Sequence, residues 1–127
     1  SELQRIDEAI AISSMSIARN MNIKAIIALT ESGSTALMMS RIRSDIPIYA
    51  FTRNEYAQRR VSLYRGVTSY PYKFIANTFS EVLSEVSKEL LQSEMVRAGD
   101  LVLITSGSPL KVEGFTNSLR IIEINNG

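Results

Sequence analysis

The sequence predicts an α/β domain with three layers, α/β/α, around a mostly parallel five-stranded sheet of order 3-2-1-4-5. Segments with the apolar spacing of helices alternate with short apolar runs that are typical of buried strands. Right-handed crossovers leave few strand orders, and sheets of this size usually run 2-1-3 or 3-2-1-4, both of which place the first strand at the centre. The last two strands are joined by a loop without a helix, so we expect the last strand to pair antiparallel at an edge.

The first third of the chain predicts a helix, a buried strand and a second helix. The first helix runs from Glu2 to about Asn20 and has one apolar face. The expected members of that face are Ile6, Ala9, Ile10, Ile17 and Met21. A strand at Ile23–Leu29 follows, and the second helix begins near Ser34, where the hydroxyl of Ser34 or Thr35 is expected to cap it. The side chains of the second helix that are expected to face inward are Leu37, Met38 and Ile42.

The middle of the chain predicts two more strands around a short helix. A strand is expected at Ile48–Thr52, and Asn54 then caps a helix at Glu55–Tyr64. Gly66 ends that helix, and the third strand follows at Val67–Tyr70.

The last part predicts a long helix and the two remaining strands. Asn77 or Thr78 opens the helix, which runs to about Val96. Its apolar stripe consists of Phe79, Val82, Leu83, Val86, Leu90 and Leu91. The fourth strand is expected at Leu101–Thr105 and the last at Ser118–Ile124. Because no repeat or linker interrupts this order, residues 1–127 are expected to form a single domain.

Composition excludes several classes of function. A net charge of +1 gives no reason to expect nucleic acid, and no apolar run is long enough to span a membrane. The chain has no cysteine and no histidine, which excludes a disulfide, a thiolate nucleophile and a Ser-His pair. No carboxylate cluster resembles a metal site, so neither a catalytic residue nor a metal is expected here. The lack of cysteine fits a reducing cytoplasm, and no secretory signal is visible.

Two similar loops follow the first and fourth strands. Each has a threonine followed by Ser-Gly-Ser, in Thr30–Thr35 and in Thr105–Pro109. Ligands of such sheets bind outside the carboxyl ends of the strands, and these two strands are expected to be neighbours there. Gly33 would let the backbone approach a ligand, while nearby hydroxyls and helix N–H groups could bind a phosphate. The Gly-Lys-Ser/Thr ending of a Walker A loop is absent. An ordinary helix-capping turn explains the same residues, and Arg53 would then be a solvated arginine.

Six short blocks carry a resemblance over nearly the whole chain. They are Asn22-Ile23-Lys24-Ala25-Ile26-Ile27, Thr30-Glu31-Ser32-Gly33, Thr52-Arg53-Asn54, Leu63-Tyr64-Arg65-Gly66-Val67, Ala98-Gly99-Asp100 and Gly114-Phe115-Thr116-Asn117. In order and spacing they resemble the C-terminal domain of pyruvate kinase, from about Asp7 to Ile124. Six blocks in register are more specific than any single one.

The resemblance implies a regulatory domain that binds a phosphorylated effector and packs beside its own catalytic barrel in a cytoplasmic homotetramer. The residues implied to hold the effector phosphate are Thr30, Glu31, Ser32, Gly33, Ser34 and Thr35. Those implied to form a lid over it are Ser106, Gly107, Ser108, Lys111 and Gly114. The barrel, which would use magnesium and potassium to transfer phosphate from phosphoenolpyruvate to ADP, is absent from this chain. We therefore expect this chain alone to be inactive.

One departure from the family concerns the effector. Members that bind fructose 1,6-bisphosphate often carry a basic residue in the long helix, and the matching position here is near Val82, on the apolar stripe. Lys111 is the only cation in the loop that matches the lid. A sugar monophosphate or AMP is therefore the expected effector. The alternative is an assembly module without an effector site. The weakest hypothesis is a free-standing α/β enzyme, because the sequence shows no candidate pair of catalytic base and nucleophile.

Overall fold

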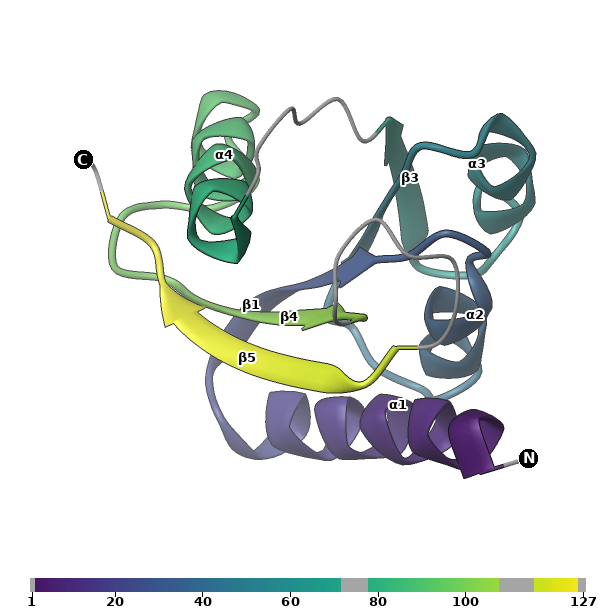
Figure 1. Ribbon diagram of the computed structural model, residues 1–127. Coiled ribbons are helices and arrows are strands. Elements are labelled where there is room, and N and C mark those ends of the chain that lie inside the picture. Colours follow the sequence, from purple (N-terminus) through teal and green to yellow (C-terminus); the bar gives the residue numbers. More distant parts are fainter. Residues whose placement is uncertain (1, 72–77, 108–115, 126–127) are drawn as a thin grey trace.

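A computed structural model of the chain describes residues 2–71, 78–107 and 116–125. Its elements, in chain order, are α1 (Glu2–Asn20), β1 (Ile23–Leu29), α2 (Ser34–Ser40), β2 (Ile48–Thr52), α3 (Glu55–Val61), β3 (Val67–Pro71), α4 (Phe79–Gln92), β4 (Leu101–Ser106) and β5 (Ser118–Glu123) (Figure 1). Every predicted element is present. The helix ends differ most from the prediction, because α3 stops at Val61 and α4 at Gln92.

The sheet confirms the predicted fold class. Its strand order is β3-β2-β1-β4-β5. β1 pairs parallel with both β2 and β4, and β2 pairs parallel with β3. β5 pairs antiparallel with β4, from Ser118 opposite Ser106 to Glu123 opposite Leu101. The carboxyl ends of the four parallel strands therefore meet at one end of the sheet, as an α/β ligand site requires.

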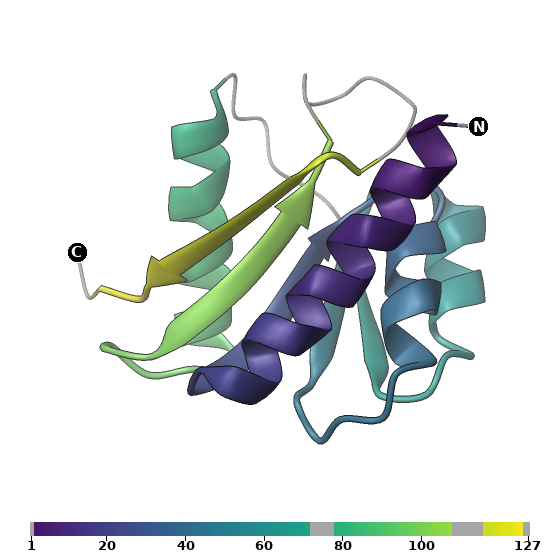
Figure 2. The ribbon, with the colours of Figure 1, turned by 90° about the horizontal axis from the view of Figure 1, so that it is seen from below.

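Helices cover both faces of the sheet and bury a separate core on each (Figures 1 and 2). On one face, α4 packs Val82, Val86 and Leu90 against alternate residues of the central strands, among them Ile27 and Ile104. On the other face, α1, α2 and α3 pack against the remaining residues of the same strands. Burial on both faces explains why β1 is an almost continuous apolar run.

The buried face of α1 differs from the prediction. Its members are the small or flexible residues Asp7, Ala11, Ser14, Met15 and Ala18. Three of the predicted members are wrong, because Ile6 and Met21 are 40% and 44% exposed and Ala9 is exposed as well. The other two, Ile10 and Ile17, are only half-buried. Small side chains let a helix axis lie close to its neighbours, which moves the larger isoleucines to the margin. In α2 the fully buried residues are likewise Thr35, Ala36 and Met39, while Leu37, Met38 and Ile42 are half-buried.

The predicted caps of α3 and α4 are confirmed. Asn54 Oδ1 accepts hydrogen bonds from the N–H groups of Tyr56 and Ala57. Thr78 Oγ1 accepts from the N–H of Glu81, while Asn77 lies outside the described residues. None of the helices in the described part of the chain has the length and apolar character needed to cross a bilayer.

Candidate functional site

The loop after β1 is held by its own hydrogen bonds. The Gly33 N–H donates to Thr30 Oγ1 over 2.9 Å, and the Ser34 N–H donates to Ser32 Oγ over 3.2 Å. The hydroxyls of Ser32 and Ser34 lie 2.9 Å apart. The N-cap of α2 is Gly33, and no side chain caps the helix, so the predicted capping by Ser34 or Thr35 is wrong. A left-handed glycine makes the turn in place of a capping hydroxyl.

Gly33 is required by both its conformation and its surroundings. Its φ of +86° lies in the left-handed region, which favours glycine. A Cβ built on Gly33 would lie 2.6 Å from Cγ1 of Val61, at the end of α3. Since Val61 is fully buried, only a residue without a side chain lets the loop lie this close to α3.

The first turn of α2 contains two backbone N–H groups that lie outside its intrahelical hydrogen bonds. Within the described residues, the N–H groups of Thr35 and Ala36 have no hydrogen-bond partner. Both residues are almost fully buried, at 2% and 0% exposure. Buried N–H groups without partners are rare in folded proteins, and those at the start of a helix suit an anion. Ser32 and Ser34 add hydroxyl groups on the more exposed side of the same loop.

The ends of β1 and β4 are adjacent, as the sequence predicts. Ala28 pairs with Thr105, one residue before the end of each strand. Ser106 ends β4 and its hydroxyl lies 2.9 Å from that of Ser118 in β5. Of the predicted lid residues, Ser106 and Gly107 are described, whereas Ser108, Lys111 and Gly114 lie outside the described residues.

A tertiary contact joins the two loop regions. The hydroxyls of Thr35 and Thr116 lie 2.6 Å apart and share a buried hydrogen bond. Thr116 follows the second loop and precedes β5. The start of α2 is thereby tied to the segment that leads into β5.

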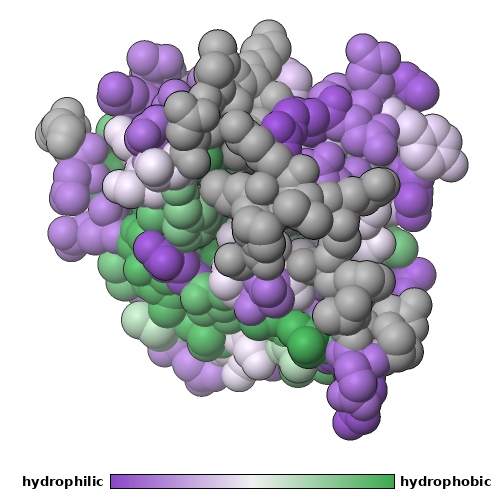
Figure 3. Space-filling model, in the orientation of Figure 1, coloured by the Kyte–Doolittle hydropathy of each residue, from purple (hydrophilic) through white to green (hydrophobic). Residues whose placement is uncertain are grey.

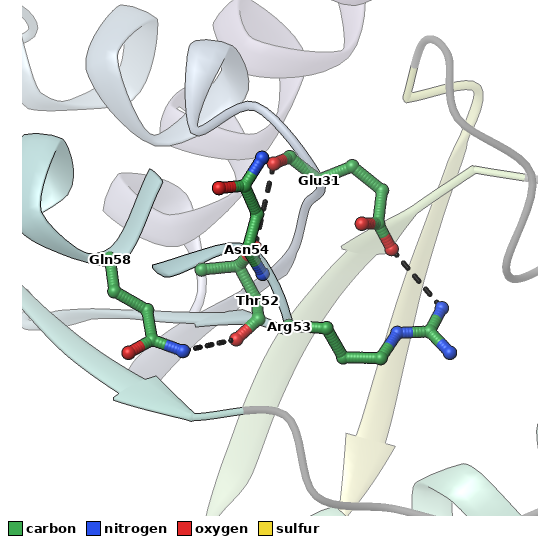
Figure 4. A network of polar contacts seen from close by, with 5 residues as sticks. All are labelled: Glu31, Thr52, Arg53, Asn54 and Gln58. Atoms are coloured by element: carbon green, nitrogen blue, oxygen red, sulfur yellow. Dashed lines mark hydrogen bonds and ion pairs between the residues drawn. The ribbon is translucent and has the colours of Figure 1, made fainter. Parts of the chain in front are cut away.

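Glu31 and Arg53 form an ion pair beside the loop (Figure 4). Arg53 Nη2 lies 3.1 Å from Glu31 Oε1, and both side chains are about one-third exposed. Between them, the Thr52 hydroxyl donates to the Glu31 carbonyl and accepts from the Asn54 N–H. Gln58 Nε2 donates to the Thr52 carbonyl over 2.9 Å. The end of β2 is therefore bonded to the loop, and Arg53 is not the free, solvated arginine of the capping interpretation.

Asp7 is a buried carboxylate that the sequence did not single out. It lies on the inner face of α1 at 6% exposure. Its Oδ1 has no partner among the described residues. Burial raises the pKa of Asp7 above its usual 3.8, and the Thr116 N–H partly opposes that rise. The one sequence signal is its spacing, because Asp7 stands one and two helical turns before Ala11 and Ser14.

This raised pKa predicts a pH-dependent cost to stability. A carboxyl group whose pKa is higher in the folded state binds a proton on folding, so the fold loses stability as pH rises through that pKa. Asp7→Asn removes the effect, so its stability relative to the parent chain should increase from about pH 3 to about pH 7. Thermal unfolding across this range measures the difference. Glu8→Gln removes an exposed carboxylate from the same turn and serves as the control. An identical pH slope for Asp7→Asn and the parent chain would contradict the prediction.

A basic cleft lies at the opposite end of the strands. It has a volume of about 550 Å³ and is lined by residues that include Arg41, Arg43 and Arg65, with Asp45 as the acidic member. It borders Ile48, where β2 begins, whereas the loop Thr30–Thr35 follows the carboxyl end of β1. Any test of anion binding must therefore separate this cleft from the loop.

No cluster of three metal-ligating side chains occurs among residues 2–71, 78–107 and 116–125. The groups that the described residues offer at this end of the sheet are backbone N–H and hydroxyl groups, which are hydrogen-bond donors.

The chain is similar to known pyruvate kinases. The family model described as "Pyruvate kinase, alpha/beta domain" matches residues 8–122. Pyruvate kinase II of Salmonella typhimurium is 39% identical over 125 residues, which are 97% of this chain and 26% of that protein. A pyruvate kinase of Buchnera aphidicola is 42% identical over 120 residues, 94% of this chain and 25% of that protein.

A solved structure agrees with these matches. The crystal structure of a pyruvate kinase from Cryptosporidium parvum superposes with a TM-score of 0.81 at 28% identity. The superposition covers 94% of this chain and 23% of that one. The chain thus spans about a quarter of the length of its curated relatives. By the family match, the identities and the shared fold, the chain belongs to the pyruvate kinase alpha/beta domain family.

Proposed function

We propose that this chain is the regulatory module of a pyruvate kinase and binds a phosphorylated small molecule at the loop Thr30–Thr35. The observation that carries the proposal is the pair of buried N–H groups of Thr35 and Ala36, which have no hydrogen-bond partner among residues 2–71, 78–107 and 116–125. They adjoin the hydroxyls of Ser32 and Ser34 at the carboxyl end of a central strand. Several N–H and O–H donors on a preformed loop are a common way to bind a phosphate.

In the parent enzyme, the module would act beside a catalytic domain that transfers phosphate from phosphoenolpyruvate to ADP, with magnesium and potassium. Its contribution would be regulatory, as one part of a cytoplasmic homotetramer. We expect no turnover from the chain by itself, because it has no histidine or cysteine and its carboxylates form no cluster in the described part.

Charge near the loop favours a single phosphate group. Arg53, which contacts the loop, is already paired with Glu31. On α4, the position that is often basic in bisphosphate-binding relatives matches a point near Val82, which is fully buried and carries no charge. A second phosphate would find no cation at that position of α4. The oxygens of a single phosphate can accept hydrogen bonds from the N–H and hydroxyl groups of the loop. A sugar monophosphate or AMP is thus the proposed effector class.

Isothermal titration of the 127-residue chain tests the proposal. The ligands are glucose 6-phosphate, ribose 5-phosphate, AMP and fructose 1,6-bisphosphate, and a monophosphate should bind tightest. Ser34→Asp places a negative charge on the loop, which should repel phosphate and weaken binding by about tenfold or more. The chain should still fold, because the start of a helix tolerates acidic residues. Arg43→Ala alters the basic cleft and should leave the affinity unchanged.

The contrary outcomes are distinct. Tightest binding of the bisphosphate would overturn the monophosphate assignment. If Arg43→Ala abolishes binding while Ser34→Asp binds as tightly as the parent chain, the anion site lies in the basic cleft and not at the loop.

An assembly module is the second candidate, and the edge strand β5 favours it. β5 has one paired neighbour, β4, and its apolar residues Leu119, Ile121 and Ile122 are half-buried. Figure 3 shows apolar side chains gathered over this part of the molecule, while polar side chains dominate the region of α3. An apolar edge strand is a surface on which a second chain can pair or pack. If none of the four phosphate compounds binds, assembly becomes the supported role.

A further inference from the structure

We propose that the basic cleft at the amino ends of the strands is a second anion site, separate from the loop Thr30–Thr35. Its ligand class is a small molecule with two or more negatively charged groups close together, either a polycarboxylate or a diphosphate. The inference does not depend on the proposed function, because none of the residues that line the cleft belongs to the loop.

The cleft has the size and lining of a small-molecule site. Its volume of about 550 Å³ lies within the range of roughly 300–1,000 Å³ that is usual for ligand pockets. Its apolar lining consists of the buried residues Met15 and Ile48 and the half-buried residues Ile42 and Ile46. An apolar lining combined with a few charged groups is typical of ligand pockets.

The charges that line the cleft are unbalanced. The three arginines Arg41, Arg43 and Arg65 stand against one aspartate, Asp45, which leaves an excess of two positive charges. All four residues are exposed, and none of them forms an ion pair in the part of the chain that the structure describes. Neighbouring charges of one sign repel, and a bound anion offsets that repulsion by its attraction to each of them. A ligand with two negative charges would balance the cleft.

Helix capping accounts for only one of the three arginines. Arg41 is the C-cap of α2, where a positive charge is favourable without any ligand. Arg43 lies two residues further along the chain, and Arg65 lies four residues beyond the end of α3 at Val61. Arg43 and Arg65 therefore carry the inference. A guanidinium group has a planar set of donors that suits the oxygens of carboxylates and phosphates.

Backbone hydrogen bonds hold the two arginine-bearing segments together. The Ile48 N–H donates to the Gly66 carbonyl over 3.0 Å, which joins the α2–β2 connection to the α3–β3 connection. The Ile26 N–H donates to the Pro47 carbonyl over 3.0 Å, which joins the first of these connections to β1. Figure 2 shows both connections at the same end of the sheet. Because the backbone of the cleft is fixed, a ligand has to order only the arginine side chains.

The cleft should bind anions more weakly than the loop does. Its arginines are exposed and are screened by salt, whereas the N–H donors proposed for the loop are buried. Fructose 1,6-bisphosphate carries two charged groups and can reach both sites. Its affinity for the loop is therefore the value measured after the cleft has been neutralised by substitution.

Arg43→Gln and Arg65→Gln, singly and together, test the inference. Glutamine removes the charge but keeps part of the side-chain stem. Arg59→Gln is the matched control, because Arg59 is exposed on α3 outside the cleft and its loss lowers the net charge equally. The probes are citrate and pyrophosphate, with acetate as the singly charged comparison, at an ionic strength of about 0.15 M. Amide ¹H–¹⁵N shifts of Ser44 and Gly66 locate the site and give the affinity.

Citrate, pyrophosphate or both should shift these two amides in the parent chain, and acetate should not. Each single variant should weaken binding by about threefold or more, and the double variant by about tenfold or more, because charged contacts are lost. Arg59→Gln should leave the affinity unchanged, and so should Ser34→Asp, which charges the loop instead. The tighter of the two probes identifies the ligand as a carboxylate or a phosphate compound.

Three results would overturn the inference. The first is the absence of shifts at Ser44 and Gly66 with both probes. The second is an equal loss of affinity in Arg59→Gln, which would mean that the anions are attracted only by the overall charge. The third is normal binding by the double variant together with no binding by Ser34→Asp, which would place the anion at the loop. Failure of the monophosphates to bind the loop would refute the proposed function alone, because the amides of the cleft report this site separately.

Discussion

Gly33→Ala is expected to lower the free energy of unfolding by about 2–5 kcal/mol, because two penalties add. A left-handed conformation costs a residue with a Cβ about 1–2 kcal/mol, and the φ of Gly33 is +86°. The new Cβ would also lie 2.6 Å from Val61 Cγ1, and overpacking a buried site costs about 1–3 kcal/mol. Urea denaturation of the variant and the parent chain measures the loss.

The chain contains matched controls for this substitution. Gly66 and Gly99 also have positive φ values, +73° and +93°, but a Cβ at either would meet nothing within 4 Å. Gly66→Ala and Gly99→Ala should therefore show the conformational penalty alone. Adding Val61→Ala to Gly33→Ala should relieve part of the extra loss, although it opens a cavity of its own. Equal losses at all three glycines would mean that the contact with α3 contributes nothing.

Phe51→Ala is expected to cost about 3–5 kcal/mol, the range for truncating a buried aromatic side chain. Phe51 is among the largest fully buried side chains of the structure, and its ring stacks on Tyr70 with centroids 5.4 Å apart. It lies one residue before the end of β2, and the N–H of Thr30 donates to its carbonyl. Its loss should therefore weaken both the core beneath α4 and the strand end that supports the loop. Thermal and urea unfolding measure the change.

Tyr56→Ala provides the control for Phe51→Ala. Tyr56 is 63% exposed on α3, so removing its ring should change stability by less than about 1 kcal/mol. Phe51→Leu keeps most of the apolar volume and should recover a large part of the loss. A cost for Phe51→Ala as small as that for Tyr56→Ala would contradict the packing described for this face.

The fold was predictable because its signals are local. The alternation of helical and strand patterns is readable within a few residues, and so are the caps at Asn54 and Thr78. Gly66 was expected to end α3, but the helix already ends at Val61 with Ser62 as its C-cap. The handedness of crossovers allows the orders 2-1-3 and 3-2-1-4, and the structure has the second, with β5 added at the edge. The buried face of α1 was missed for a physical reason. Hydrophobicity was taken as the guide to burial, whereas the close approach of α1 selects small residues such as Ala11 and Ser14.

The site was only partly predictable, because its contacts span the chain. The residues of the loop Thr30–Thr35 could be named from their types and place after β1. The partners that hold the loop could not: Arg53, Val61 and Thr116 reach it only through tertiary structure. Asp7 was hidden for the same reason, since an acid near the start of a helix is ordinarily a favourable surface residue.

The internal bonding of the loop has a consequence for the kinetics of recognition. A receptor already held in its binding shape loses little conformational freedom when it captures a ligand, and association can then proceed near the rate of orientationally restricted diffusion. Such a loop would bind different phosphate esters at similar rates. It would distinguish them by their dissociation rates, that is, by how long each one stays bound.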